Sequence, residues 1–224
     1  GTDDSCSGAC VGTADLTVSG GVPPYTFSWS NGATSEDIAS LCAGTYINDI
    51  TDANGCVISD TVIISEPSGL TSGIVGTDIS CNGACDGAAD LTVTGGTTPY
   101  TYDWSNGATT QDITGLCAGI YNVTVTDSNS CSVFSSVTIS EPAVLATSIA
   151  STNVSCNSAC DGAVDLSIAG GTTPYTYSWS NGATTQDITG LCADTYFVAV
   201  TDSNLCTISD TAIITEPSVL TANI

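Results

Sequence analysis

The sequence predicts an all-β protein: tandem small antiparallel β-sandwiches, stapled by disulfides and arranged as beads on a fibre. Three observations support this. The same segment is written three times at an interval of 75 residues, as in Trp29, Trp104 and Trp179. Apolar residues alternate with period two inside each copy. Twelve cysteines recur at fixed positions, four in each copy.

The copies follow one another without insertion or deletion, so their boundaries can be read directly. Each copy ends in a Glu-Pro step, at Glu66-Pro67, Glu141-Pro142 and Glu216-Pro217. We expect repeat 1 over 1–67, lacking its opening strand, repeat 2 over 68–142 and repeat 3 over 143–217. Residues 218–224 then match the opening strand of a further repeat.

The second copy illustrates the elements in order. Alternating apolar residues predict four strands in succession: Leu91 and Val93; Tyr100, Tyr102 and Trp104; Tyr121, Val123 and Val125; and Val133, Val137 and Ile139. Glycine, proline and Asp-Ser-Asn clusters separate these runs. Asn106-Gly107 predicts a tight hairpin turn, because a type I′ turn needs positive φ at both central residues.

Six or seven such strands in about 75 residues indicate an immunoglobulin-like sandwich. Trp104 falls on the third strand, as in that fold. The run from Leu116 to Tyr121 precedes the sixth strand, so the Tyr121 hydroxyl is expected to bond back to the preceding loop.

The charge composition excludes several classes of function. The chain has 23 acidic residues and no Lys, Arg or His, for a formal charge of −23. Nucleic-acid binding and polybasic attraction to lipid both depend on cations, so neither is expected. Without His or Lys the chain lacks the usual general bases, so we expect no enzyme, no catalytic residues and no cofactor. No apolar run reaches the length of a membrane span, so the chain is not expected to be membrane-embedded.

The cysteines predict a disulfide framework and therefore an extracellular location. One pair lies at the start of the second strand and in the loop before the sixth, at one end of the sandwich. This favours Cys10–Cys42, Cys85–Cys117 and Cys160–Cys192. Elimination then pairs Cys6–Cys56, Cys81–Cys131 and Cys156–Cys206, which simple sandwich topology accommodates less well.

Three kinds of ligand or modification site are considered. Asp52, Asp127 and Asp202 are calcium candidates, although no D-x-D-x-D loop is present and each Asp can instead cap its own turn. The aromatic row Tyr100, Tyr102 and Trp104 could stack on sugars, but one face of a strand normally fills the core. Thr61 and Thr211 follow Asp and precede an apolar residue, a pattern for O-glycosylation.

The last seven residues have two interpretations. They match the segments that open the second and third copies, and they could continue a longer covalent array. Alternatively, they could complete the first repeat of another molecule by donor-strand complementation. The polymer junction would then consist of Ser218, Val219, Leu220, Thr221, Ala222, Asn223 and Ile224.

The stretch from Cys81 to Cys131 resembles the SprB repeat, a module of large cell-surface adhesins of gliding and other Bacteroidetes. The resemblance rests on "GGTTPYTYDWSNGATT", "LCAGIY", "VTDSNSC" and the closing "EP". It implies export by type 9 secretion, cell-surface display, and a role in adhesion or gliding motility. The first copy departs from the pattern at Val11, where Asp86 and Asp161 stand, and at Asn48, where Val123 and Val198 stand.

The expected function is therefore a structural segment of a long extracellular adhesin or filament, giving reach, stiffness and multivalent attachment. Its partners would be copies of the same repeat, head to tail. The alternatives are a module that binds surface glycans or calcium, and a pilus-like subunit joined through 218–224.

Overall fold

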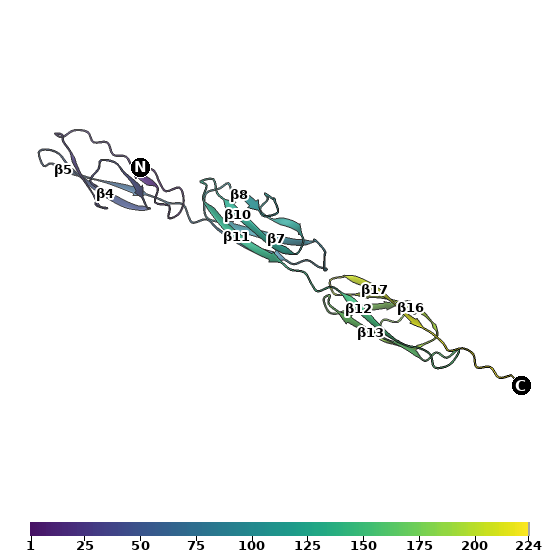
Figure 1. Cartoon of the computed structure of the whole chain (residues 1–224). Helices are drawn as coiled ribbons and strands as arrows, with labels where there is room; N and C mark the ends of the chain where they lie inside the picture. The colour runs from purple at the N-terminus through teal and green to yellow at the C-terminus, as the bar shows by residue number, and fades with distance from the viewer. Residues whose placement is uncertain (224) are drawn as a thin grey trace. The chain divides into compact units, whose positions relative to one another are not determined.

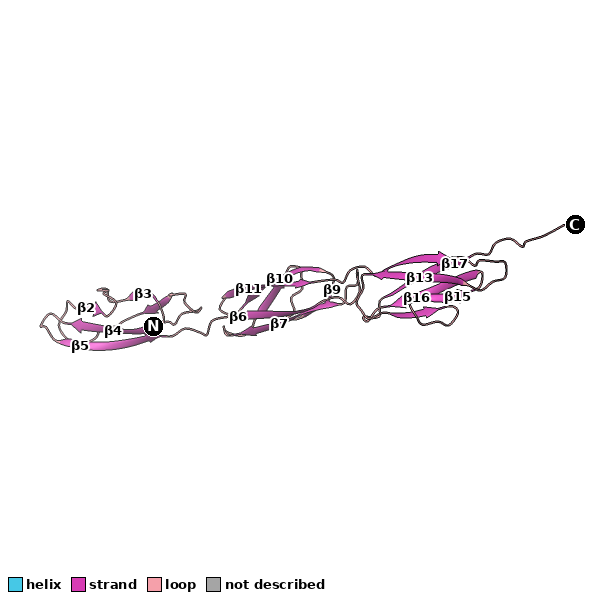
Figure 2. Cartoon of the chain, turned by 90° about the horizontal axis from the view of Figure 1, so that it is seen from below, coloured by secondary structure: helices cyan, strands magenta, loops and turns pink. Residues whose placement is uncertain are grey.

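The computed structural model describes residues 1–223 and contains only strands, turns and loops in that range (Figures 1 and 2). The all-β prediction is therefore confirmed. The chain divides into two compact units, which we describe separately. One unit comprises 1–75, 90–112 and 121–137, and the other comprises 76–89, 113–120 and 138–224.

The first repeat lies in the first unit and has two antiparallel sheets. The two-stranded sheet consists of β1 (Gly12–Ala14) and β3 (Ile38–Leu41). The three-stranded sheet consists, in spatial order, of β2 (Thr26–Trp29), β4 (Gly44–Thr51) and β5 (Val57–Ile64). Buried Ala14, Trp29, Ile38, Leu41 and Ile64 form the core between them. Two polar residues are also buried here, Asp4 and Asn48.

The third repeat lies in the second unit and has two three-stranded sheets. Their strands, in spatial order, are β12 (Ala146–Thr152), β13 (Gly162–Ala169) and β15 (Ile188–Leu191), and then β14 (Thr176–Trp179), β16 (Asp194–Thr201) and β17 (Thr207–Ile214). Inward-facing Val164, Leu166, Trp179, Val198 and Val200 fill the core, as period-two alternation predicts. The result is a small β-sandwich.

The strands of the second repeat follow the same two orders. They are β6 (Thr71–Thr77), β7 (Gly87–Thr94) and β9 (Ile113–Leu116), and then β8 (Thr101–Trp104), β10 (Gly119–Thr126) and β11 (Ser132–Ile139). Leu91, Trp104, Val123 and Val125 are buried here, each at 2% exposure or less.

The Asn-Gly turn differs from the predicted hairpin. β14 pairs with β16, so the strands on either side of Asn181-Gly182 are not partners. Only the glycine has positive φ, at +86°. The turn instead closes on itself, with Gly182 N donating to Trp179 O at 2.9 Å and the Asn181 side chain accepting from Ala183 N. The expected bond from the tyrosine corner is present at Tyr196, whose hydroxyl donates to Cys192 O at 3.1 Å.

Candidate functional site at the joints between repeats

Two disulfides connect successive repeats, one at each of the two junctions. Cys6 is bonded to Cys131 and Cys81 to Cys206, with the Cα atoms 5.7 Å apart in both bonds. The predicted pairs Cys6–Cys56, Cys81–Cys131 and Cys156–Cys206 are therefore wrong. The other three bonds, Cys10–Cys42, Cys85–Cys117 and Cys160–Cys192, are within repeats, as the sequence predicts. We call each contact built around an inter-repeat disulfide a joint.

One side of each joint is a short loop that carries an asparagine and a cysteine. In the first joint, Asn129 Nδ2 donates to Ser5 O at 2.9 Å, beside the Cys6–Cys131 bond. In the second joint, Asn204 Nδ2 donates to Ser80 O at the same distance. The two joints are thus built from equivalent residues with equivalent geometry.

A buried aspartate holds this loop in shape. Asp127 Oδ1 accepts from Asn129 N and Cys131 N at 2.9 and 2.8 Å, and Oδ2 accepts from Thr97 N at 2.9 Å. Asp202 makes the same three bonds in the third repeat. The carboxylate therefore positions both residues that enter the joint.

These hydrogen bonds also set the ionisation of the aspartates. Burial acts to raise the pKa of Asp127 and Asp202, but the backbone donors outweigh it and the pKa of each carboxyl is lowered. For Asp52 the backbone N–H of Cys56 is the largest cause of a lowered pKa. All three aspartates are thus anionic turn caps at neutral pH. Within residues 1–223 no group of three or more acidic, His or Cys side chains is arranged to hold a metal ion.

The other side of each joint is the loop that carries Ser-Cys. Asp86 accepts from the backbone N–H and the hydroxyl of Ser80, and Asp161 accepts from Ser155 N at 2.9 Å. The side-chain hydrogen bond from Ser155 is the largest cause of the lowered pKa of Asp161. The first repeat has Val11 at this position, and there Asp4 Oδ1 accepts from Gly12 N instead.

The Glu-Pro step is fixed to the same loop. Glu141 Oε2 accepts from Gly83 N at 3.0 Å, and Asn82 Nδ2 donates to Pro142 O at 3.0 Å. Glu216 and Asn157 repeat this arrangement with Ser158 N and Pro217 O. The opening segment of the next repeat therefore begins beside the loop that carries the cysteine of the joint.

The opening strand completes the repeat that it enters. β12 pairs with β13 along its full length, from Ala146 opposite Ala169 to Thr152 opposite Ala163. Gly171 N donates to Ala143 O at 2.8 Å, and a Cβ placed on Gly170 would lie 1.9 Å from Val144 O. Gly170 is thus required both for its φ of +68° and for this close approach. The pair Gly95 and Gly69 O shows the same relation at 2.0 Å.

The first repeat has no opening strand over this site. β1 covers only Gly12–Ala14, whereas β13 runs from Gly162 to Ala169. A Cβ on Gly20 would meet nothing within 4 Å. A hollow of about 230 Å³ lies here, lined by Val18, Gly20, Gly21, Tyr25, Ile50, Asp52, Cys56 and Ile58, among others. Ile58 is 66% exposed, although its counterpart Ile208 packs against the core.

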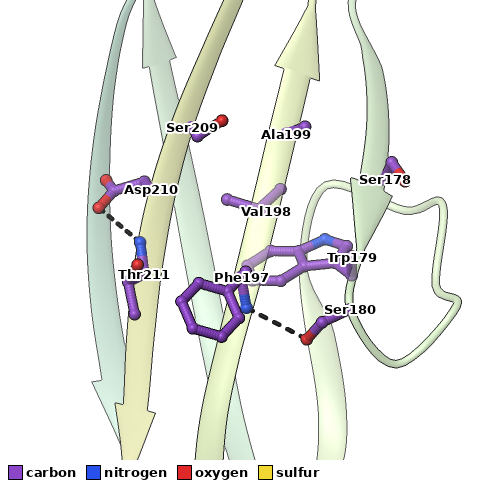
Figure 3. A pocket seen from close by; sticks show the side chains of 9 residues that line it. All are labelled: Ser178, Trp179, Ser180, Phe197, Val198, Ala199, Ser209, Asp210 and Thr211. Atoms are coloured by element: carbon purple, nitrogen blue, oxygen red, sulfur yellow. Dashed lines mark hydrogen bonds between the residues drawn. The ribbon is translucent and has the colours of Figure 1, made fainter.

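The aromatic rows pack against the interior: Trp104 is buried, and Tyr100 and Tyr102 are half-buried. Trp104 is 2% exposed and its Nε1 donates to Thr110 O at 2.9 Å. The hydroxyls of Tyr100 and Tyr102 bond to Gly95 O and Gln111 Oε1. Figure 3 shows the equivalent region of the third repeat, where Trp179 and Phe197 line a hollow of about 380 Å³. Phe197, which the pattern does not single out, is the exposed ring there, at 58%.

The glycosylation candidates lie on the last strand of their repeats. Thr61 on β5 and Thr211 on β17 are exposed. Each donates its backbone N–H to the preceding Asp at 2.7 Å, and Thr211 lines the hollow in Figure 3. The calcium and glycosylation assignments both stay predictions.

The exposed tail is the remaining candidate. Ser218 to Asn223 have no strand assignment and are exposed, and Leu220 is 97% exposed. Ile224 lies outside the described residues.

The Ser-Cys side of each joint lies in a segment that matches a known family model. The family model described as SprB repeat matches residues 2–34, 74–109 and 148–184. The chain carries three SprB repeats. The matched ranges include the Ser-Cys loop, the Gly-Gly pair and the core tryptophan of each SprB repeat. No curated protein sequence matches the chain.

Several solved structures are similar at low identity. Domains 3–5 of Drosophila OTK match at 12% identity and a TM-score of 0.36, covering 87% of this chain and 86% of that one. The amphioxus IgVJ-C2 molecule matches at 13% identity and a TM-score of 0.29, covering 59% of this chain and 97% of that one. Sidekick-1 immunoglobulin domains 1–5 match at 10% identity and a TM-score of 0.33, covering 86% of this chain. The chain spans about half the length of that structure, 52%. In the described residues no helix is long and apolar enough to span a membrane.

Proposed function

We propose that the chain is a structural segment of an extracellular cell-surface adhesin or filament. Its role would be to give reach and stiffness and to present many copies of one module for multivalent attachment. The observation that carries this proposal is the pair of equivalent joints, Cys6–Cys131 and Cys81–Cys206. A covalent bond from each repeat to the next restricts bending at the Glu-Pro step, which is the property that a spacer needs.

Other features support the same role. Proteins with this many disulfides for their length belong to oxidising compartments outside the cytoplasm. The conspicuous aromatic and acidic residues of the described chain are used in the core and in turn capping, which supports a structural role. The SprB repeat family adds surface display on Bacteroidetes, type 9 secretion and gliding motility as parts of the proposal.

Stiffness can be tested by removing each class of disulfide. Paired variants Cys6→Ser/Cys131→Ser and Cys81→Ser/Cys206→Ser should broaden the distribution of distances between spin labels placed in the first and third repeats. The matched control is Cys10→Ser/Cys42→Ser, which removes a bond within a repeat and should leave the width unchanged. Equal widths in all variants would contradict a spacer role for the joints.

A second candidate is a module in which each repeat binds a glycan or calcium. The hollow beside Phe197 and Thr211 supports this alternative (Figure 3). Calorimetry with calcium and with a glycan panel separates the two. Saturable binding at about one site per repeat would replace the purely structural proposal.

A further inference from the structure

The two ends of the described chain each carry half of a joint. The cysteines free of disulfides in residues 1–223 are Cys56 and Cys156, and both are exposed. Cys56 is the counterpart of Cys131 and Cys206, and Cys156 is the counterpart of Cys6 and Cys81. We call Asn54, Cys56 and the uncovered edge at 15–21 the acceptor end. Ser155, Cys156 and the tail 218–223 are the donor end.

We propose that the donor end of one chain joins the acceptor end of a second copy through an inserted strand and a Cys56–Cys156 disulfide. This inference deepens the proposed function and rests on it. It differs from the pilus-like alternative above in that a disulfide also links the two copies covalently.

The acceptor end already has the geometry of a joint. Asp52 Oδ1 accepts from Asn54 N and Cys56 N, both at 2.9 Å, as Asp127 does for Asn129 and Cys131. The last pair of the opening strand is also present. Thr2 is bridged to Thr13, and these two residues correspond to Thr152 and Ala163, which pair at the end of β12. The site is therefore folded except for the strand that would cover Val18 and Gly20.

The donor end is likewise organised. Asp161 Oδ1 accepts a hydrogen bond from Ser155 N. The hydrogen bonds of Glu216 and Asn157 fix the Glu-Pro step to the loop that contains Cys156. A hollow of about 390 Å³ lies against Cys156 and Leu220. The Cys156 thiol and the start of the tail therefore lie at the same end of the third repeat, as the internal joints require.

The internal joints define the register of the new one. Transferring the β12–β13 pairing places Thr221 opposite Ser19 and Asn223 opposite Thr17. Leu220 takes the place of Leu145, whose Cδ1 lies 2.9 Å from a Cβ placed on Gly171, and so enters the hollow at Gly21. Asn54 Nδ2 then donates to Ser155 O of the second copy, as Asn129 does to Ser5.

The new bond needs an oxidant, and a small-molecule disulfide supplies it. The Cys56 thiolate attacks one sulfur of RSSR, which forms a protein mixed disulfide and releases one RSH. The Cys156 thiolate of the second copy attacks the protein sulfur and releases the second RSH. The two protein thiols lose two electrons to RSSR, and their two protons leave on the RSH products.

Complementary single-cysteine variants test the pairing. The chain is incubated with reduced and oxidised glutathione and analysed by non-reducing electrophoresis and mass spectrometry. We expect a ladder from the unaltered chain, and only dimer from an equimolar mixture of Cys56→Ser and Cys156→Ser. Each variant alone should stay monomeric. Homodimers of either variant, or loss of both thiols in a monomer, would overturn the proposal.

Matched substitutions test the inserted strand. A side chain at Gly20 fits the free repeat but would collide with the incoming carbonyl, so Gly20→Asn should reduce joining about tenfold or more. Gly32→Asn is the control, with a similar φ of +87° and equally open surroundings. Leu220→Asn should also reduce joining about tenfold. Val219→Asn should not, because its counterpart Val144 remains 62% exposed in the internal joint. If each variant joins as well as its control, the proposed strand insertion is wrong.

The outcomes separate this inference from the proposed function. Monomers that keep narrow inter-repeat distances would overturn only the contact between copies. A chain that forms the ladder but binds one glycan or calcium per repeat would overturn only the purely structural role.

Discussion

Cys6 of the first repeat is bonded to Cys131 of the second, although Cys56 of its own repeat occupies the same sequence position as Cys131. The loop that it closes spans a sequence separation of 125 residues. A long closed loop restricts the unfolded chain strongly, so this bond is a source of stability as well as of stiffness.

Removing the first joint should therefore destabilise the chain. In Cys6→Ser/Cys131→Ser we expect a loss of about 2–4 kcal/mol, measured by calorimetry under non-reducing conditions. Cys56→Ser is the control, because its thiol is free, and its unfolding should match that of the unaltered chain. Equal unfolding of the double variant and the control would show that the joint does not contribute.

The second prediction concerns the buried tryptophan of the third repeat. Trp179 is 3% exposed and its Nε1 donates to Thr185 O at 2.9 Å. Trp179→Ala should cost about 3–5 kcal/mol of unfolding free energy in denaturant titrations, because it leaves a cavity in the core. Phe197→Ala, on the exposed ring in the same hollow, should change stability by less than about 0.5 kcal/mol. Equal losses would contradict the assignment of core and surface.

The third prediction concerns pH. The lowered pKa of Asp202 means that its contribution to stability is present above the unfolded value of 3.8. That contribution is lost as the pH falls through the lower folded value. Asp202→Asn should lower the Tm at pH 7, because an amide N–H then faces the donor Thr172 N. The difference in Tm from the unaltered chain should shrink between pH 4 and pH 2.

The comparison of variants is needed because the other carboxylates titrate as well. Protonation relieves repulsion within a chain of formal charge −23, which acts in the opposite direction. Asp210→Asn, on a strand outside the joint loop, is the control. A Tm difference for Asp202→Asn that does not vary with pH would contradict the assigned role.

The fourth prediction concerns the buried amide of the first repeat. Asn48 is fully buried, its Oδ1 accepts from Ser28 N, and its Nδ2 has no partner. Asn48→Val introduces the residue found at Val198 and should stabilise the first repeat by about 1–3 kcal/mol. The reverse change, Val198→Asn, should destabilise the third repeat by a similar amount. Thermal unfolding of both variants measures the effect, and opposite signs are required.

Much of the fold followed from local patterns. The alternation around Trp104 gave the strands and their buried face, and the sandwich end shared by Cys85 and Cys117 identified their bond. The joint could not be predicted in the same way. Cys56 and Cys131 stand in nearly identical local sequence, so spacing cannot tell a bond within a repeat from one to the next. The unfavourable placement of Cys6–Cys56 in a sandwich was the available signal.

The role of the aspartates was only partly visible. Turn capping by Asp127 followed from its own local sequence, but its part in placing Asn129 and Cys131 depends on the contact with Ser5, which lies over a hundred residues away. Similarly, the collision at Gly95 becomes apparent only when the carbonyl of Gly69 lies against it.

The overlap of the two long disulfides has a consequence for damage. The bond from Cys6 to Cys131 and the bond from Cys81 to Cys206 together span every peptide bond between residues 6 and 206. A single proteolytic cut anywhere in that range leaves both fragments attached to each other. The chain can thus be cut once in this range and still transmit tension from one fragment to the other.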